Sequence, residues 1–513
     1  MHIRSSSSRT PGLRLALVAT LLAVPPLGTS PLAAQSFSPD AFGDYVAQAF
    51  TDWDAVGLAV AVVKEGELVF ARGYGELELG SGQLVDAETR FSIGSTTKAM
   101  TAGAIGMLVD EGKVAWDDPV VKHLPWFQLS DPWMTREITI RDLLTHRAGL
   151  GNTDFLWYEH DVSREWVVEQ VKHAELAYSP RTSFIYQNIM YATAGLVVEA
   201  VSGMRWADFI EERIFEPLDM TETFSLLSET TGQPNVASPH FTVDGERMVI
   251  ENASVDPVDA AGSVWSSVED MSRWLRMLLN EGVAADGTRL LSEAVVEEMF
   301  TPQTMVTPSQ FYPTQQVTEP NWMTYGLAWF QHDFRGRKLD FHTGSIDGMV
   351  AIAGLIRDEN LGVYVLANRD HVEVRHALMY RALDHFLAPD DMRDWSAELK
   401  PLYEGIEAAG AAALAQRAAS REEGTMPSHP LEAYAGTYES EMYGEVTVEV
   451  RGDALYVDRS PGLRGPASHW HYDTFLVEWE ARWRGDALGT FEIGASGTVE
   501  ALMVNGIRWM RVG

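Results

Sequence analysis

Strand and helix patterns follow one another along residues 40–388 in an order that narrows the possible folds. Two strand patterns come first, joined by Glu65-Gly66, a pair that suits a hairpin turn. Helical patterns then dominate up to about residue 280, and strand patterns return before a closing helix. Strands at both ends with helices between them predict an α+β domain. Its single antiparallel sheet would be assembled from pieces that are distant in the sequence.

The expected elements have these bounds. The strands cover residues 57–64, 67–73, 338–342, 349–356 and 361–368. The helices cover residues 40–53, 95–110, 139–145, 189–202, 206–215, 268–280 and 372–387. Gly112 stands where a C′ glycine would end the second helix. We therefore assign residues 35–388 to one domain.

The composition changes after residue 388, and a second domain is expected. An Ala/Glu/Arg-rich stretch at 408–421 predicts a connecting helix within a linker at 389–430. Short strand patterns recur from 431 to 513 with little helix between them. They cover residues 444–451, 454–458, 474–479, 490–493, 499–504 and 508–512. This spacing indicates a small all-β domain, an antiparallel barrel or sandwich.

The N-terminus has the order of a secretory signal. Three arginines precede or open an apolar run from Leu15 to Leu27, and small residues at 31–35 offer a cleavage point. The run is short for a membrane span and is broken by Pro25-Pro26. We expect residues 1–34 to be a signal peptide, with an uncleaved anchor as the alternative. The mature protein would then be exported, periplasmic or secreted, without a stable membrane span.

Charge and cysteine content exclude several classes of function. The chain has 39 basic and 73 acidic residues, a formal charge of −34, which repels nucleic acid and anionic lipid. It has no cysteine, which excludes disulfides, cysteine nucleophiles and thiolate metal sites. His469 and His471 are more simply explained as strand surface than as metal ligands. We expect neither a metal nor a cofactor.

Ser95-Thr96-Thr97-Lys98 opens one of the predicted helices. The spacing of three places the serine hydroxyl and the lysine amine on one face of the first turn. A neutral lysine can accept the serine proton, so the pair could act as nucleophile and base. The alternative is an N-cap serine beside an exposed lysine, and the motif alone does not decide between them.

Two further segments carry polar groups suited to a site. Tyr186-Gln187-Asn188 precedes an apolar helix, where the phenol could relay protons and the amide could hold a substrate carbonyl or the lysine. His342-Thr343-Gly344-Ser345 ends a strand pattern, where Thr343 and Gly344 would let a substrate lie close and His342 would add a donor. Each segment alone is as well explained by ordinary structure.

Taken together and in this order, the three motifs resemble the penicillin-binding and class C β-lactamase type of serine hydrolase. Surrounding segments agree, among them Phe91-Ser92-Ile93-Gly94, Thr139 to His146, Ala261 to Ser267 and Tyr325-Gly326-Leu327. The resemblance implies an antiparallel sheet flanked by its terminal helices, beside an all-helical part, with the site between them. The segment 431–513 is similar, more loosely, to a β-barrel domain appended to many such relatives.

The resemblance also implies roles for the site residues. Ser95 would be the acylated nucleophile, with Lys98 and Tyr186 sharing the work of base and acid. Asn188 would orient substrate and lysine, and His342, Thr343 and Gly344 would line the strand side. The backbone N–H groups of Ser95 and Ser345 would form the oxyanion hole.

One departure bears on the substrate. β-Lactamases and transpeptidases of this type usually carry lysine where this chain has His342, which looks more like the esterase and D-aminopeptidase relatives. An imidazole with an ordinary pKa is mostly neutral at pH 7 and gains charge toward pH 6. We therefore expect a serine hydrolase of small esters or amides, with D-amino-acid peptides and β-lactams as further substrate candidates. The alternative is a penicillin-binding or peptide-sensing module with little turnover, and the oligomeric state is left open.

Overall fold

A computed structural model describes residues 37–513. The predicted signal peptide at 1–34 lies outside the described residues. Within residues 37–513, no helix combines the length and the apolar character that a membrane span needs.

An eight-stranded sheet forms the centre of the first domain, in the order β2-β1-β12-β11-β10-β9-β8-β7. Its strands are β1 (Gly57–Lys64), β2 (Glu67–Gly75), β7 (Thr304–Met305), β8 (Met323–Tyr325), β9 (Phe330–Phe334), β10 (Arg337–Ile346), β11 (Met349–Ile356) and β12 (Leu361–Ala367). β1 pairs antiparallel with β12, with Leu58 opposite Ala367. This pairing confirms the predicted antiparallel sheet, because it joins segments that are about 300 residues apart.

The hairpin between β1 and β2 turns at the predicted pair. Glu65 and Gly66 both adopt positive φ, 52° and 80°. Two consecutive residues in this region form the turn that matches the twist of paired strands. The predicted hairpin is therefore observed, with a shift in the register of β1 against β2 between Val62 and Val63 that the turn pair does not predict.

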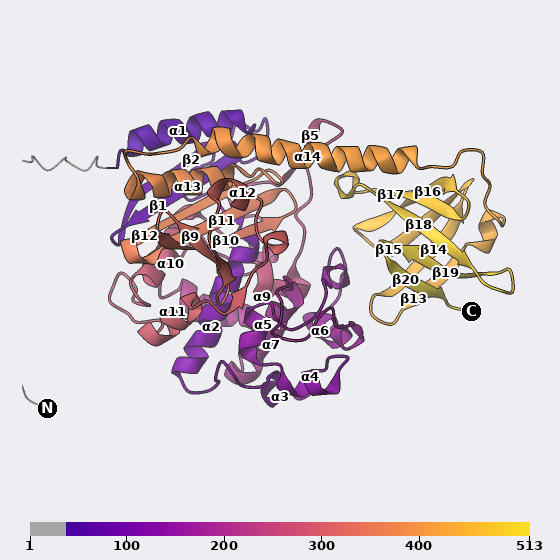
Figure 1. The fold of residues 1–513 in the computed structure, drawn as a ribbon, viewed down its shortest axis with the longest axis horizontal. Coiled ribbons are helices and arrows are strands. Elements are labelled where there is room, and N and C mark those ends of the chain that lie inside the picture. Colours follow the sequence, from indigo (N-terminus) through magenta and orange to yellow (C-terminus); the bar gives the residue numbers. More distant parts are fainter. Residues whose placement is uncertain (1–36) are drawn as a thin grey trace, which may run out of the picture. The chain divides into compact units, whose positions relative to one another are not determined.

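Each face of the sheet carries its own core. Leu58, Val60 and Val62 on β1 belong to a cluster with helices α1 (Pro39–Asp52) and α13 (Val374–Leu387). The alternate residues Ala59, Ala61 and Val63 belong to a cluster with the helical part of the domain. Because both faces are covered, every one of these six side chains is almost fully buried. Figure 1 shows α1 and α13 on the same side of the sheet.

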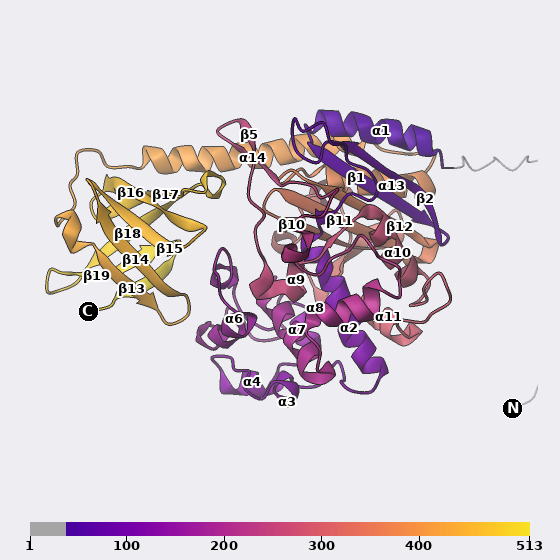
Figure 2. The same cartoon turned by 180° about the vertical axis from the view of Figure 1, so that it is seen from behind.

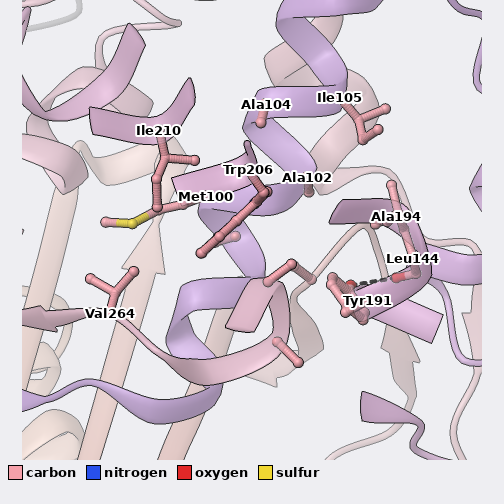
Figure 3. Close-up of a cluster of buried hydrophobic side chains, with 14 of the residues drawn as sticks. Met100, Ala102, Ala104, Ile105, Leu144, Tyr191, Ala194, Trp206, Ile210 and Val264 are labelled. Atoms are coloured by element: carbon pink, nitrogen blue, oxygen red, sulfur yellow. Dashed lines mark hydrogen bonds between the residues drawn. The ribbon is translucent and has the colours of Figure 1, made fainter. Parts of the chain in front are cut away.

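The helical part is built around α2 (Lys98–Asp110) and α7 (Asn188–Ser202), two helices in which most residues are buried. Alanines at 99, 102 and 104 and glycines at 103 and 106 let neighbouring helices approach α2 closely. Trp206 and Ile210 pack near Met100, and the Tyr191 hydroxyl donates to the Leu144 carbonyl at 2.6 Å (Figure 3). The helix that carries Lys98 is therefore held rigidly.

The remaining elements of this domain are shorter. The helices are α3 (Val120–His123), α4 (Pro132–Glu137), α5 (Ile140–Leu144), α6 (Arg164–Gln170), α8 (Trp206–Ile210), α9 (Asp259–Gly262), α10 (Val268–Leu279), α11 (Glu293–Phe300) and α12 (Gln315–Thr318). Two small sheets pair β3 (Phe91–Ser92) with β6 (Trp265–Ser266) and β4 (His240–Val243) with β5 (Glu246–Val249).

Helix α14 (Trp395–Ala419) lies in the segment predicted as a linker and is longer than the helix expected at 408–421. Beyond it, eight strands close into an antiparallel barrel (Figure 2). They are β13 (Gly436–Ser440), β14 (Gly444–Arg451), β15 (Ala454–Ser460), β16 (Leu463–His471), β17 (Thr474–Glu478), β18 (Asp486–Ile493), β19 (Val499–Val504) and β20 (Ile507–Arg511). The pairing of β13 with β20 closes it, so the barrel of the two predicted alternatives is the one observed.

Candidate active site

Ser95 and Lys98 lie at the start of the buried helix α2. A 3₁₀ turn at Gly94–Thr97 precedes the helix, and side chains three apart are eclipsed in such a turn. The Lys98 amine and the Ser95 hydroxyl are 3.0 Å apart. Ser95 is partly exposed, whereas Lys98 is fully buried. The N-cap serine with an exposed lysine is therefore not what the structure contains.

Two other oxygens contact the Lys98 amine. It donates to the Asn188 side-chain carbonyl at 2.7 Å and to the Ala261 backbone carbonyl at 2.9 Å. Burial lowers the pKa of Lys98 well below 10.5, and the Asp154 carboxylate offsets this only in part. A neutral amine has two N–H groups and one lone pair. Because Asn188 and Ala261 take the two N–H groups, the lone pair is left to accept the Ser95 proton.

Tyr186 lies over the same amine, with its ring centroid 4.8 Å from the Lys98 nitrogen. Burial raises the pKa of Tyr186 well above 10, and the nearby Ser95 hydroxyl counteracts this partly. The Tyr186 hydroxyl is buried and has no well-formed hydrogen bond to any atom of residues 37–513. A protonated phenol without a partner beside the nucleophile is able to donate to a leaving group.

His146 holds the Tyr186 segment from behind. Its ring lies tilted by 33° against the Tyr186 ring with the centroids 4.2 Å apart, and its Nδ1 accepts the backbone N–H of Gln187 at 3.0 Å. Burial, and then the nearby Lys98 and His342, lower the pKa of His146 well below 6.5. A neutral imidazole therefore fixes this segment and adds no charge to the site.

Asn188 is the first residue of α7 and connects Lys98 to an acid. Its Nδ2 donates to Asp154 at 3.0 Å, while its Oδ1 accepts from Lys98. Gln187, the preceding residue, is buried and accepts from the Thr153 hydroxyl at 3.1 Å. These bonds determine which end of the Asn188 amide faces the lysine.

The structure corrects the expectation that His342 gains charge near pH 6. Its Nδ1–H donates to the Thr343 carbonyl at 2.6 Å, which leaves Nε2 to accept from the Tyr325 hydroxyl at 3.1 Å. The side chain is 1% exposed, and burial lowers its pKa to about 3. Both nitrogens are thus occupied by the protein, so His342 offers a substrate neither a free donor nor a positive charge.

The end of β10 lies directly against the turn that carries Ser95. A Cβ on Gly344 would lie 1.9 Å from the Ile93 carbonyl, and one on Gly94, where φ is +51°, would lie 2.7 Å from the Ser345 nitrogen. Arg375, paired with Glu373, donates to the Gly344 carbonyl at 2.5 Å and to the Ser345 hydroxyl at 3.0 Å. Glycine at both positions lets the backbones of Ser95 and Ser345 lie side by side.

These groups open into a cavity of about 370 Å³. Thr343 lies in its wall, with its hydroxyl 2.7 Å from that of Tyr312. The lining residues are Ser95, Asp154, Tyr186, Asn188, Gln310, Phe311, Tyr312, Pro313, Phe330, His342, Thr343 and Ser345. Across residues 37–513, no group of three or more His, Asp or Glu side chains could hold a metal ion.

The structure thus brings together Ser95, Lys98, Tyr186, Asn188 and the strand 342–345, all of which the motifs had selected. Sequence reasoning missed Asp154, Tyr312 and Arg375. None of these belongs to a motif, and each reaches the site through tertiary contacts. Tyr325 was noted only as part of a matching segment, and its contact with His342 was not predicted. His146 was noted only as part of a matching segment, and its role depends on contacts with residues 186 and 187.

The fold and the Ser95–Lys98–Tyr186 arrangement define a serine hydrolase of the penicillin-binding type. A family model described as beta-lactamase matches residues 43–387, most of the chain, and the protein therefore belongs to the beta-lactamase family of hydrolases. A domain of unknown function, DUF3471, matches residues 420–509, which cover the barrel up to its last strand, β20.

Among curated relatives, an unguisins hydrolase from Aspergillus campestris is 30% identical over 444 residues, covering 82% of this chain and 79% of its own length. Its counterpart from Aspergillus violaceofuscus is 29% identical over 452 residues, covering 82% and 78%.

Solved structures share the fold. An octameric penicillin-binding protein homologue from Pyrococcus abyssi aligns with a TM-score of 0.60 at 22% identity, covering 93% of this chain and 100% of its own. A D-stereospecific amidohydrolase from Streptomyces sp. aligns with a TM-score of 0.53 at 24% identity, covering 65% and 95%.

Proposed function

We propose that the protein is an exported serine hydrolase that cleaves small esters or amides through an acyl-enzyme on Ser95. The observation that carries this proposal is the contact of Ser95 with a buried Lys98 whose two N–H groups are already used. Relatives named as hydrolases of unguisins and as a D-stereospecific amidohydrolase support amide bonds as substrates.

The geometry supports the following sequence of steps. Lys98 accepts the Ser95 proton as the hydroxyl oxygen attacks the substrate carbonyl carbon. The N–H groups of Ser95 and Ser345 stabilise the resulting oxyanion. The Tyr186 hydroxyl protonates the leaving alkoxide or amine as its bond to carbon breaks, and the proton on Lys98 replaces the one that Tyr186 gives up. Water then attacks the acyl-enzyme, with the same groups accepting its proton and returning one to Ser95.

The cavity favours small acyl groups without a negative charge over anionic ones. Its volume is near the lower end of the range for small-molecule sites. Phe311, Tyr312 and Phe330 give it an aromatic wall. A neutral His342 supplies no cation for the carboxylate of a β-lactam or of a C-terminal D-residue. We therefore rank esters and amides without a carboxylate above β-lactams as substrates.

The test is the Ser95→Ala variant. Loss of the nucleophile should lower kcat for p-nitrophenyl acetate by at least about 10³-fold and abolish labelling by a fluorophosphonate. The matched control is Ser309→Ala, an exposed serine of the segment next to the cavity, which should behave like wild type. Near-full activity in purified Ser95→Ala would reject the assignment.

A penicillin-binding or peptide-sensing module with little turnover is the second candidate. Its distinguishing property is a stable acyl-enzyme, so a fluorescent penicillin would label Ser95 and remain attached while no ester or amide is turned over. Rapid release of acid from the ester, with steady turnover, favours the hydrolase. Export is tested separately, by sequencing the N-terminus of the mature chain from the periplasm or medium.

A further inference from the structure

Asp154 places a carboxylate in the cavity wall. Of the described residues that line the cavity, it is the one with an acidic side chain, and none of them is lysine or arginine. The side chain is partly exposed and lies beside Asn188. Neither the motifs nor the proposed acylation chemistry gives this group a function.

The partners of the carboxylate are neutral. Oδ2 accepts from Asn188 Nδ2 at 3.0 Å and from Asn152 Nδ2 at 3.3 Å, and Oδ1 accepts from Trp157 Nε1 at 2.9 Å. None of the ion pairs within residues 37–513 includes Asp154, so no nitrogen of a lysine, arginine or histidine lies within 4.0 Å of its carboxylate. A carboxylate offers about four acceptor directions, so three donors leave room for one more.

The two nearest basic groups of the site do not neutralise it. Lys98 lies on the other side of the Asn188 amide, and its burial favours the uncharged amine. His342 has both nitrogens engaged within the protein. A substrate that enters the cavity therefore meets one uncompensated negative charge close to Ser95.

We propose that Asp154 is the specificity-determining residue that binds a cationic group, the ammonium of an amino ester or amino amide, on the acyl side of the substrate. The inference rests on the proposed hydrolase function and names its substrate class. The acyl group occupies the site during both acylation and deacylation. An ammonium on that group can therefore contact Asp154 in both half-reactions. An ammonium–carboxylate hydrogen bond in a partly buried site is worth about ten- to a hundredfold in binding.

The competing explanation is that Asp154 only orients the Asn188 amide. The Asp154→Asn variant separates the two, because the new side-chain carbonyl can still accept from Asn188 Nδ2 while the negative charge is gone. Asp161→Asn is the matched control. It removes the same charge from the same loop at an exposed side chain that does not line the cavity.

The experiment compares methyl 2-aminobutanoate, as both enantiomers, with methyl butanoate at pH 6.5, where the amine carries its proton. The measured quantity is the ratio of kcat/KM for the amino ester to that for the neutral ester. We expect Asp154→Asn to lower this ratio about tenfold or more, and Asp161→Asn to leave it at the wild-type value. An equal fall for both esters, or an unchanged ratio, overturns the proposal and leaves Asp154 as a positioning residue.

Two further measurements distinguish failure of the proposed hydrolase function from failure of the inference about Asp154. Fluorophosphonate labelling of Ser95 in wild type reports the hydrolase function itself. If neither labelling nor ester hydrolysis occurs, the proposed function fails and this inference fails with it. If Asp154→Asn does not fold, inhibition of the wild type decides: n-butylammonium should inhibit at least about tenfold more strongly than butyrate, and equal inhibition overturns the proposal.

Discussion

Burial sets the protonation state of each basic side chain in the site. A charge on Lys98 lowers the pKa of both His146 and His342, and a charge on His342 lowers the pKa of His146. Desolvation is the larger cause in all three cases. The Asp154 carboxylate opposes this at Lys98 alone, and burial favours the uncharged form of all three side chains. This is the state in which Lys98 can act as a base.

Lys98→Ala is expected to cost about as much activity as Ser95→Ala, at least about 10³-fold in kcat, because the two side chains act as one unit. The double variant should be no worse than either single variant. Steady-state kinetics of all three purified proteins on p-nitrophenyl acetate measure this. Losses that multiply in the double variant would show that the residues act independently.

The same lysine predicts the sign of the acid limb in the pH profile. Protonation of Lys98 removes the lone pair that accepts the Ser95 proton, so kcat/KM falls as the pH drops through the pKa of Lys98. Burial holds that pKa well below 10.5, and the Asp154 charge raises it. In Asp154→Asn the acid limb should therefore move to lower pH. A limb that stays in place would mean that this carboxylate does not act on Lys98.

The residues that the sequence predicted lie in three short motifs. Spacing brings together the members of each motif, such as Ser95 and Lys98, whereas the meeting of the three motifs at one site was implied by the family resemblance. Asp154 reaches Asn188 across 34 residues. The state of His342 depends on Tyr325 and on packing around β10, neither of which a single sequence discloses. Its ordinary pKa was therefore the wrong starting point.

At the scale of elements, the site depends on the close approach of the Gly94–Thr97 turn to the end of β10. Arg375, at the start of α13, donates to the backbone carbonyls of Gly344 and Ala351 and so holds this end of the strand in place. The helix and the strand come from opposite ends of the domain sequence. The oxyanion site is thus a property of their packing and not of either element alone.

Gly94→Ala should disrupt this packing. The residue has φ +51°, and the new Cβ would lie 2.7 Å from the Ser345 nitrogen, so strand and turn must separate. We expect kcat/KM to fall about a hundredfold, as for loss of one oxyanion donor, with a smaller loss of thermal stability. Gly405→Ala on α14 is the control, since no atom lies within 4 Å of its added Cβ. Wild-type turnover in Gly94→Ala would show that the approach has no catalytic importance.

The sheet face covered by α13 contains a buried histidine that destabilises the fold at acidic pH. His332 on β9 is fully buried among Phe311, Phe341 and Tyr380, and its Nε2 has no partner within residues 37–513. Burial lowers its pKa from 6.5 to about 4. The unfolded chain therefore binds more protons between these pH values, and the contribution of His332 to stability becomes less favourable as the pH falls from 6.5 to 4.

His332→Phe removes that group and keeps an aromatic ring in place. Relative to wild type, the variant should gain about 2 kcal/mol of unfolding free energy between pH 7 and pH 5. Urea denaturation at the two pH values measures the difference. A pH-independent difference between the two proteins would show that His332 titrates normally in the folded state.

Strands with a continuous apolar pattern were predicted from sequence, whereas very short or interrupted strands of the central sheet were not. β1, β11 and β12 are continuous apolar runs and were found within one or two residues of their bounds. β7 and β8 have only two and three residues, and buried Gln331 and His332 interrupt the apolar pattern of β9. β16 was missed because Gly465 and Pro466 resemble a turn, although both lie within the paired strand.

The net charge of the whole molecule and the charge of the cavity wall are both negative, so both attract cationic substrates and repel anionic ones. The chain carries a formal charge of −34, and the cavity wall adds Asp154 without a basic partner. A field of one sign raises the local concentration of oppositely charged small molecules and lowers that of like-charged ones. Salt weakens this field, with a screening length of about 10 Å at 0.1 M.

Salt should therefore separate substrates by charge. Between 20 and 500 mM NaCl at pH 6.5, kcat/KM should fall by roughly two- to fivefold for methyl 2-aminobutanoate, rise for the anionic monomethyl succinate, and stay level for methyl butanoate. The neutral ester controls for effects of salt on the fold and on the acylation steps. In Asp154→Asn the salt response of the amino ester should become smaller but persist, because the surface charge remains. Parallel changes for all three esters would mean that the acidic surface has no influence on which substrates reach Ser95.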